Sequence, residues 1–110
     1  MQEVYNLEIL SPAQKELDAI AQRHMSIVGA DSARKITNRI YGSLAHLRTF
    51  PDMGVLCKDK ELRLQGFRQL ICEKYLCLYR LIGDTVFVYH IVDGRMDYPV
   101  IFADVVSKMS

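Results

Sequence analysis

The segment YHIVDGRMDYP, residues 89–99, places several side chains capable of chemistry at the end of an apolar run. The imidazole of His90 can accept and donate a proton near neutral pH. The guanidinium of Arg95 can bind a phosphate or a carboxylate through two hydrogen bonds. Tyr98 adds a hydroxyl that can donate or accept. Asp97 adds a carboxylate between them. The four residue types His, Arg, Asp and Tyr together suggest acid–base chemistry on an anionic substrate.

Each of these side chains also has a structural interpretation. His90 lies within an apolar run, where a histidine is commonly a hydrogen-bonded core residue. Arg95 can form an ion pair with Asp93 or Asp97. Tyr98 precedes a proline and is therefore extended, so its ring can pack against a sheet edge. Both interpretations stay open until the elements that carry these residues are placed.

Composition limits the class of protein. The chain has 110 residues, half of them hydrophobic, which predicts a single globular domain over residues 1–110. The formal net charge of +1 gives no argument for nucleic acid, and no apolar run is long enough to span a membrane. The start MQEVYNLEILSP does not resemble a signal peptide. We therefore expect a cytoplasmic protein.

The three cysteines are odd in number and show no Cys-x-x-Cys spacing. We expect Cys57, Cys72 and Cys77 to be reduced thiols. The three histidines have no spacing that would complete a metal site with them. The sequence predicts neither a metal nor another cofactor.

Periodicity predicts a strand followed by two helices. Alternating apolar residues in EVYNLEIL indicate a strand with one buried face. Ser11 is the expected cap of a first helix, with Pro12 in its first turn and Gly29 at its end. Asp31 or Ser32 is the expected cap of a second helix with an apolar stripe up to Leu47. The short connection makes the two helices an antiparallel hairpin.

Three strands follow a segment without clear periodicity, VLCKDKELRLQG, which we expect to be a loop leading to an edge strand. The strands are FRQLIC, YLCLYRLI and TVFVYHIV, joined by two-residue turns at Glu73-Lys74 and Gly83-Asp84. The fold class is therefore α+β: an N-terminal strand, a helix hairpin, a three-stranded antiparallel meander and a short C-terminal segment.

The Gly83-Asp84 turn predicts the register of the last hairpin: Tyr79 faces Val88, Cys77 faces His90, Leu78 faces Tyr89 and Leu76 faces Ile91. Both faces of the hairpin are then largely apolar, and a helix hairpin covers only one. The tail DYPVIFADVV can cover part of the other face, and we expect a partner to cover the rest. The predicted partner-binding residues are Leu76, Leu78, Phe87 and Tyr89, with Arg80 against an acidic group and Arg63, Arg68 and Lys74 in a mild positive patch.

The order of elements and several motifs resemble one family. The marks are LEILSPAQKELDAI, ARKITNRIYGSLAHLRTFPDMG, LRLQGFRQLICEKYLCLYRLIGDTVFVYHIVDGRMD and the Arg-x-Asp-Tyr ending. Together they are similar to the RelE/ParE superfamily, the toxins of bacterial type II toxin–antitoxin modules. The resemblance implies a toxin that is neutralised by a cognate antitoxin and exists as a homodimer or in a heterotetramer with that antitoxin. It implies one of two targets: DNA gyrase for ParE-like members, or mRNA on the ribosome for RelE-like ribonucleases.

The ribonuclease pattern carries over only in part. Cleavage through the 2′-hydroxyl needs an acid, a base and cations around the phosphate. The resemblance assigns these roles to Arg95, Arg68 and Tyr98, with His90 as a further candidate. Leu76 stands where RelE-like members carry an early arginine of the third strand. We therefore expect a toxin of gyrase or of an unassigned nucleic-acid machine, with an mRNA interferase and an inactive antitoxin-binding module as alternatives.

Overall fold

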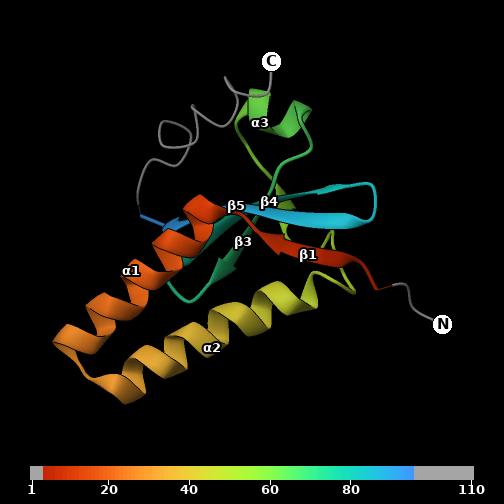
Figure 1. Cartoon of the computed structure of the whole chain (residues 1–110). Helices are drawn as coiled ribbons and strands as arrows, with labels where there is room; N and C mark the ends of the chain where they lie inside the picture. Colours follow the sequence, from red (N-terminus) through yellow and green to blue (C-terminus); the bar gives the residue numbers. More distant parts are fainter. Residues whose placement is uncertain (1–3, 96–110) are drawn as a thin grey trace.

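The computed structural model describes residues 4–95 and shows a mixed five-stranded sheet with helices on both sides (Figure 1). The strand order is β1-β5-β4-β3-β2, with β1 parallel to β5 and every other pair antiparallel. The elements are β1 (Asn6–Ile9), α1 (Ser11–Ile27), α2 (Ala30–His46), β2 (Val55–Leu56), α3 (Lys60–Leu64), β3 (Arg68–Cys72), β4 (Tyr75–Ile82) and β5 (Thr85–Asp93). The predicted α+β class is confirmed. Asp97, Tyr98 and the tail DYPVIFADVV lie outside the described residues.

The helix hairpin packs its apolar stripe on one face of the sheet. Gly29, at a φ of +136°, separates α1 from α2 in a backbone conformation that favours glycine. Most of this stripe is buried against β3, β4 and β5, but Ile27 and Val28 at the end of α1 are exposed. Figure 1 shows the two helices lying along this face of the sheet. The buried residues of this helix–sheet core are Ala13, Leu17, Ile20, Ile36, Ile40, Leu44, Leu47, Cys72, Tyr75, Cys77, Tyr79, Val86, Val88 and Ile91. Within the described residues, no helix has the length and apolarity to cross a membrane.

The predicted helix caps were wrong. Leu10 is the N-cap of α1, and Ser11 already belongs to the helix. The backbone N–H of Leu10 donates to the Val88 carbonyl, while its carbonyl accepts from Gln14 N–H. The chain therefore passes from sheet to helix at one residue, without a side-chain cap. The N-cap of α2 is Gly29 rather than Asp31 or Ser32, and α2 also has no side-chain cap.

The segment predicted to be a loop contains α3. The Asp59 carboxylate accepts from Leu62 N–H at 3.1 Å and so caps this short helix. The segment lies on the face of the sheet opposite the helix hairpin (Figure 1). There it forms a second apolar core of Cys57, Leu62, Phe67, Leu76, Leu78 and Val92, with Tyr89 packed against it. The chain itself therefore covers Leu76 and Leu78, so these two side chains are not available to a partner in this conformation.

The predicted register of the β4–β5 hairpin is right near the turn and wrong beyond it. The pairs from Ile82↔Thr85 to Tyr79↔Val88 are as expected. A β-bulge then leaves Tyr89 without an opposite residue, so that Leu78 faces His90, Cys77 faces Ile91 and Leu76 faces Val92. The predicted pairs Cys77–His90, Leu78–Tyr89 and Leu76–Ile91 were therefore wrong. A two-residue turn fixes the pairs next to it but carries no information on a later inserted residue.

Candidate functional site

The end of β5 and the adjacent face of α1 line an open cavity of about 750 Å³. Arg95 follows β5, Arg23 comes from α1, and Lys74 comes from the β3–β4 turn. Between them lie the apolar residues Ala19, Ile20, Ile91 and Val92. The carboxylates of Glu16 and Asp93 complete the lining. The cavity therefore combines three cations and two carboxylates with apolar side chains.

Arg95 is held by Asp93 and is also exposed. Its backbone N–H and Nε donate to Oδ1 of Asp93 at 2.9 and 3.1 Å, and Nη2 donates to Oδ2 at 3.0 Å. These hydrogen bonds lower the pKa of Asp93 to about 2. The side chain of Arg95 is nonetheless 82% exposed. Because a guanidinium has five N–H donors and only two are used here, Arg95 can still bind an anion.

His90 is anchored to α1. Its Nδ1 lies 3.0 Å from Oε1 of Glu16, and the same oxygen accepts from the backbone N–H of Ile91. The His90 side chain is only 19% exposed. Glu16 therefore fastens α1 to β5 just after the bulge. This arrangement favours the structural interpretation of His90 over that of a general base.

Arg68 is far from Arg95. Its Nη1 donates to the carbonyl of Gly54 at 2.7 Å, and it lines a different cavity beside Tyr5 and Asp52. Arg68 faces Tyr79 on β4, whereas Asp93 faces Tyr75. Tyr75 and Tyr79 are four residues apart on β4, which corresponds to a distance of about 13 Å along the strand at about 3.3 Å per residue. The structure therefore does not bring the two arginines of the predicted catalytic set together, and Tyr98 lies outside the described residues.

Arg80 makes contacts that hold the chain together. Its guanidinium lies 4.8 Å from the ring centroid of Phe67 and 5.6 Å from that of Tyr89. Its Nε donates to the Tyr89 hydroxyl, and Nη1 donates to the Gln65 carbonyl. Arg80 thus ties the α3 segment to the sheet, and Tyr89 packs against the second core.

The remaining residues predicted to bind a partner lie in different places. Phe87 is half-buried opposite Arg80. Arg63 is exposed, and its guanidinium donates to the Lys58 carbonyl. Of the residues predicted to form a positive patch, only Lys74 lines the Arg95 cavity.

Sequence reasoning missed two charged members of this cavity, Glu16 and Arg23. Their spacing of seven residues places them on one face of α1, which is the available signal. Only the packing of α1 against β5 shows that this face meets Arg95. Within residues 4–95, no group of three His, Cys, Asp or Glu side chains could hold a metal ion.

Comparison with known protein families decides the assignment. The family model described as ParE toxin of type II toxin–antitoxin system, parDE, matches residues 7–98 of this chain. The chain belongs to the ParE toxin family. Toxin ParE3 of Caulobacter vibrioides is 30% identical over 86 residues, which cover 78% of this chain and 83% of that protein.

Solved structures show the same fold. The chromosomal ParDE system from P. aeruginosa matches this ParE-family chain with a TM-score of 0.70 at 20% identity, covering 83% of this chain and 97% of that one. A mutant of E. coli toxin RelE in the free state matches with a TM-score of 0.66 at 14% identity. The match covers 97% of this chain and 99% of that one. These structures confirm the predicted fold, and the family match over residues 7–98 confirms the predicted superfamily.

Proposed function

We propose that this ParE-family toxin arrests bacterial growth by acting on DNA gyrase. The family match over residues 7–98 is the observation that carries the proposal. ParE-like members of the superfamily act on gyrase, whereas RelE-like members cleave mRNA. The exposed Arg95 beside the cavity is the side chain best placed to contact the target.

The distribution of cations supports gyrase over mRNA cleavage. A phosphate in a cleavage transition state needs several charged donors within hydrogen-bond distance. Here Arg68 donates to main-chain carbonyls in another cavity. Leu76 is apolar and 3% exposed. Among the described residues of the expected ribonuclease set, Arg95 alone presents an exposed cation at this cavity.

We also propose that a cognate antitoxin binds and neutralises the toxin. The structural neighbour RelBE2 from Mycobacterium tuberculosis is a toxin–antitoxin complex, with a TM-score of 0.55 at 17% identity over 82% of this chain and 91% of that one. The P. aeruginosa neighbour is likewise part of a ParDE toxin–antitoxin system. A heterotetramer with the antitoxin or a homodimer remains the proposed assembly.

Induced expression without the antitoxin tests the proposal. We expect growth arrest with a DNA-damage response, while translated mRNA stays intact by primer extension. Cleaved mRNA would replace the gyrase target with the ribosome. Normal growth with abundant soluble protein would contradict a toxin and favour an inactive antitoxin-binding module.

A further inference from the structure

We propose that the surface around Lys74 binds an acidic, amphipathic peptide segment of a protein partner. Lys74 lines two cavities: the Arg95 cavity described above and a second one of about 570 Å³ between α1, α2 and the β3–β4 turn. The second cavity is lined in part by His24, Lys35 and Tyr75. We call the two cavities together the Lys74 surface.

The charged side chains of the Lys74 surface that have no ion-pair partner within residues 4–95 are all cations. Every carboxylate in the two cavities already engages a donor: Glu16 with His90 and Ile91, Asp31 with Arg34, Glu73 with Arg39, and Asp93 with Arg95. Within residues 4–95, neither Arg23 nor Lys35 has a hydrogen bond or an ion pair. The ammonium of Lys74 lies 5.5 Å from the ring centroid of Tyr75 and forms no ion pair in this part of the chain. Three cations are therefore available to an acidic partner, although the net charge of the chain is only +1.

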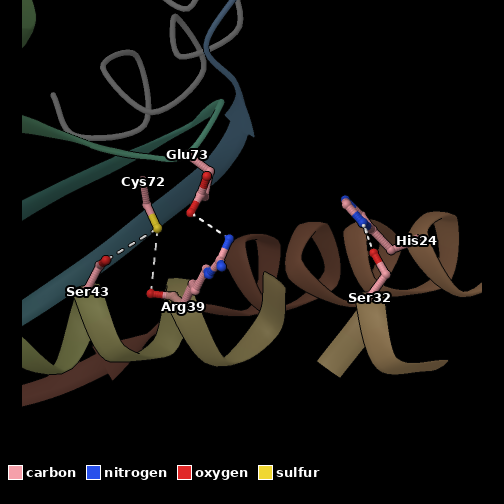
Figure 2. Close-up of polar contacts among 6 residues, drawn as sticks. All are labelled: His24, Ser32, Arg39, Ser43, Cys72 and Glu73. Carbon is pink, nitrogen blue, oxygen red and sulfur yellow. Dashed lines mark hydrogen bonds and ion pairs between the residues drawn. The ribbon is translucent and has the colours of Figure 1, made fainter. Parts of the chain in front are cut away.

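The second cavity has fixed walls. His24 of α1 lies 3.1 Å from the Ser32 hydroxyl of α2 and 3.2 Å from the Tyr75 hydroxyl of β4. Figure 2 shows the His24–Ser32 contact and, beside it, the ion pair from Arg39 of α2 to Glu73 of the turn. The same view shows Cys72 of β3 between the Ser43 hydroxyl and the Arg39 carbonyl. Because these contacts join α1, α2 and the sheet, a partner binds without a large ordering cost.

The lining favours a peptide over a nucleic acid. Unpaired bases bind by stacking on exposed aromatic rings, but Tyr75 is 1% exposed, and the ring nitrogens of His24 are engaged by the Ser32 and Tyr75 hydroxyls. Apolar side chains line both cavities: Ala19 in the first, and Val28, which is 70% exposed, in the second. A segment with apolar side chains between carboxylates matches both features, because its apolar groups contact the cavities and its acids pair with the three cations.

The inference deepens the proposed function, because the partner would be the antitoxin. We take as probe the short protein encoded by the reading frame next to the toxin, bound to the full chain. The test variant is R23E/K35E/K74E. The matched control is K15E/K58E/K60E, which reverses three exposed lysines that line neither cavity. Circular dichroism and urea unfolding confirm that both variants fold, and R23A/K35A/K74A replaces the test variant if it does not.

We expect the test variant to bind the probe more weakly than the wild-type chain does. Its affinity for the probe in calorimetry should fall at least about tenfold, with a weaker salt dependence, while the control behaves as wild type. Unchanged affinity of the test variant for the probe would overturn the inference and leave the toxin proposal intact. Tighter binding of a single-stranded 12-mer DNA than of the probe would overturn the peptide assignment. A wild-type chain that does not arrest growth contradicts the proposed function instead, and the affinities still test the surface.

Discussion

At the residue scale, the pairing of Arg95 with Asp93 was one of two interpretations available from the sequence. The structure shows that the pair and the exposure of Arg95 are compatible, because Asp93 uses only one edge of the guanidinium. The contributions of Glu16 and Arg23 were not predictable, since their roles depend on how α1 packs on β5. Local spacing identified the charged pair, but only tertiary packing identified its neighbours.

The ionisation of Asp93 reports on this pair. We expect the Asp93 carboxyl in the folded protein to titrate near pH 2 and to return toward about 3.9 in Arg95→Ala, where the donors of the guanidinium are lost. Because the folded-state pKa is lowered, the pair stabilises the fold above about pH 4, and this contribution is lost as the pH falls toward 2. Carboxyl NMR titration measures both values. Equal pKa values in the two proteins would show that the pair does not form.

Gly54 lies against main chain and a buried tyrosine. A Cβ at this position would stand 2.6 Å from the Gln69 carbonyl oxygen and 2.8 Å from the Tyr79 hydroxyl, which itself accepts from Gly54 N–H. We expect Gly54→Ala to lower the free energy of unfolding by about 2 kcal/mol in urea denaturation. The control Gly42→Ala, in open space on α2, should be neutral or stabilise by up to about 1 kcal/mol. Equal stability of the two variants would contradict the close packing at Gly54.

At the element scale, the helix stripes and the strands of the meander followed their expected periodicity. The bulge at Tyr89 did not, because an inserted residue inside an apolar run leaves no gap in the pattern. The structure stabilises the strand after the bulge through Glu16, which reaches from α1 to the backbone N–H of Ile91. The end of β5 and α1 thus stabilise each other through this contact.

Removing the Glu16 carboxylate tests this dependence. We expect Glu16→Ala to lower the free energy of unfolding by about 1–3 kcal/mol, because it leaves a partly buried N–H without its acceptor. Glu16→Gln keeps one carbonyl oxygen and should lose less. Lys15→Ala, at an exposed neighbouring position, serves as control. Hydrogen exchange of the Ile91 amide should accelerate in Glu16→Ala alone, and unchanged exchange would count against the tie.

At the scale of the whole molecule, the order of elements was predictable, but the cover of the second sheet face was not. The two-sided apolar sheet led to the expectation that a partner covers much of that face. The α3 segment supplies part of this cover, and its sequence signal is weak because α3 spans only five residues after the Asp59 cap. Lys74 was predicted to bind, but the neighbouring cavities depend on contacts between distant segments. The distribution of charged residues along the sequence therefore could not identify the Lys74 surface.

The reactivity of the three cysteine thiols tests the packing of both cores. Burial raises the pKa of Cys77, on the helix side, to about 12, and that of Cys57, in the second core, to about 11. Since unfolded cysteines ionise from about pH 8.5, stability should decrease as the pH rises above that value. At pH 8 we expect Ellman's reagent to react slowly with the native protein and to label three thiols after unfolding. Rapid labelling of all three in the native state would contradict two closed cores.

Plasmid supercoiling by purified DNA gyrase tests the central claim most directly. The wild-type protein is predicted to inhibit supercoiling of a relaxed plasmid in a dose-dependent way. Arg95→Ala should inhibit much less while keeping the same circular dichroism spectrum and a cooperative urea transition, because its side chain is exposed. Undiminished supercoiling in the presence of excess wild-type protein that still arrests growth in cells would contradict gyrase as the target.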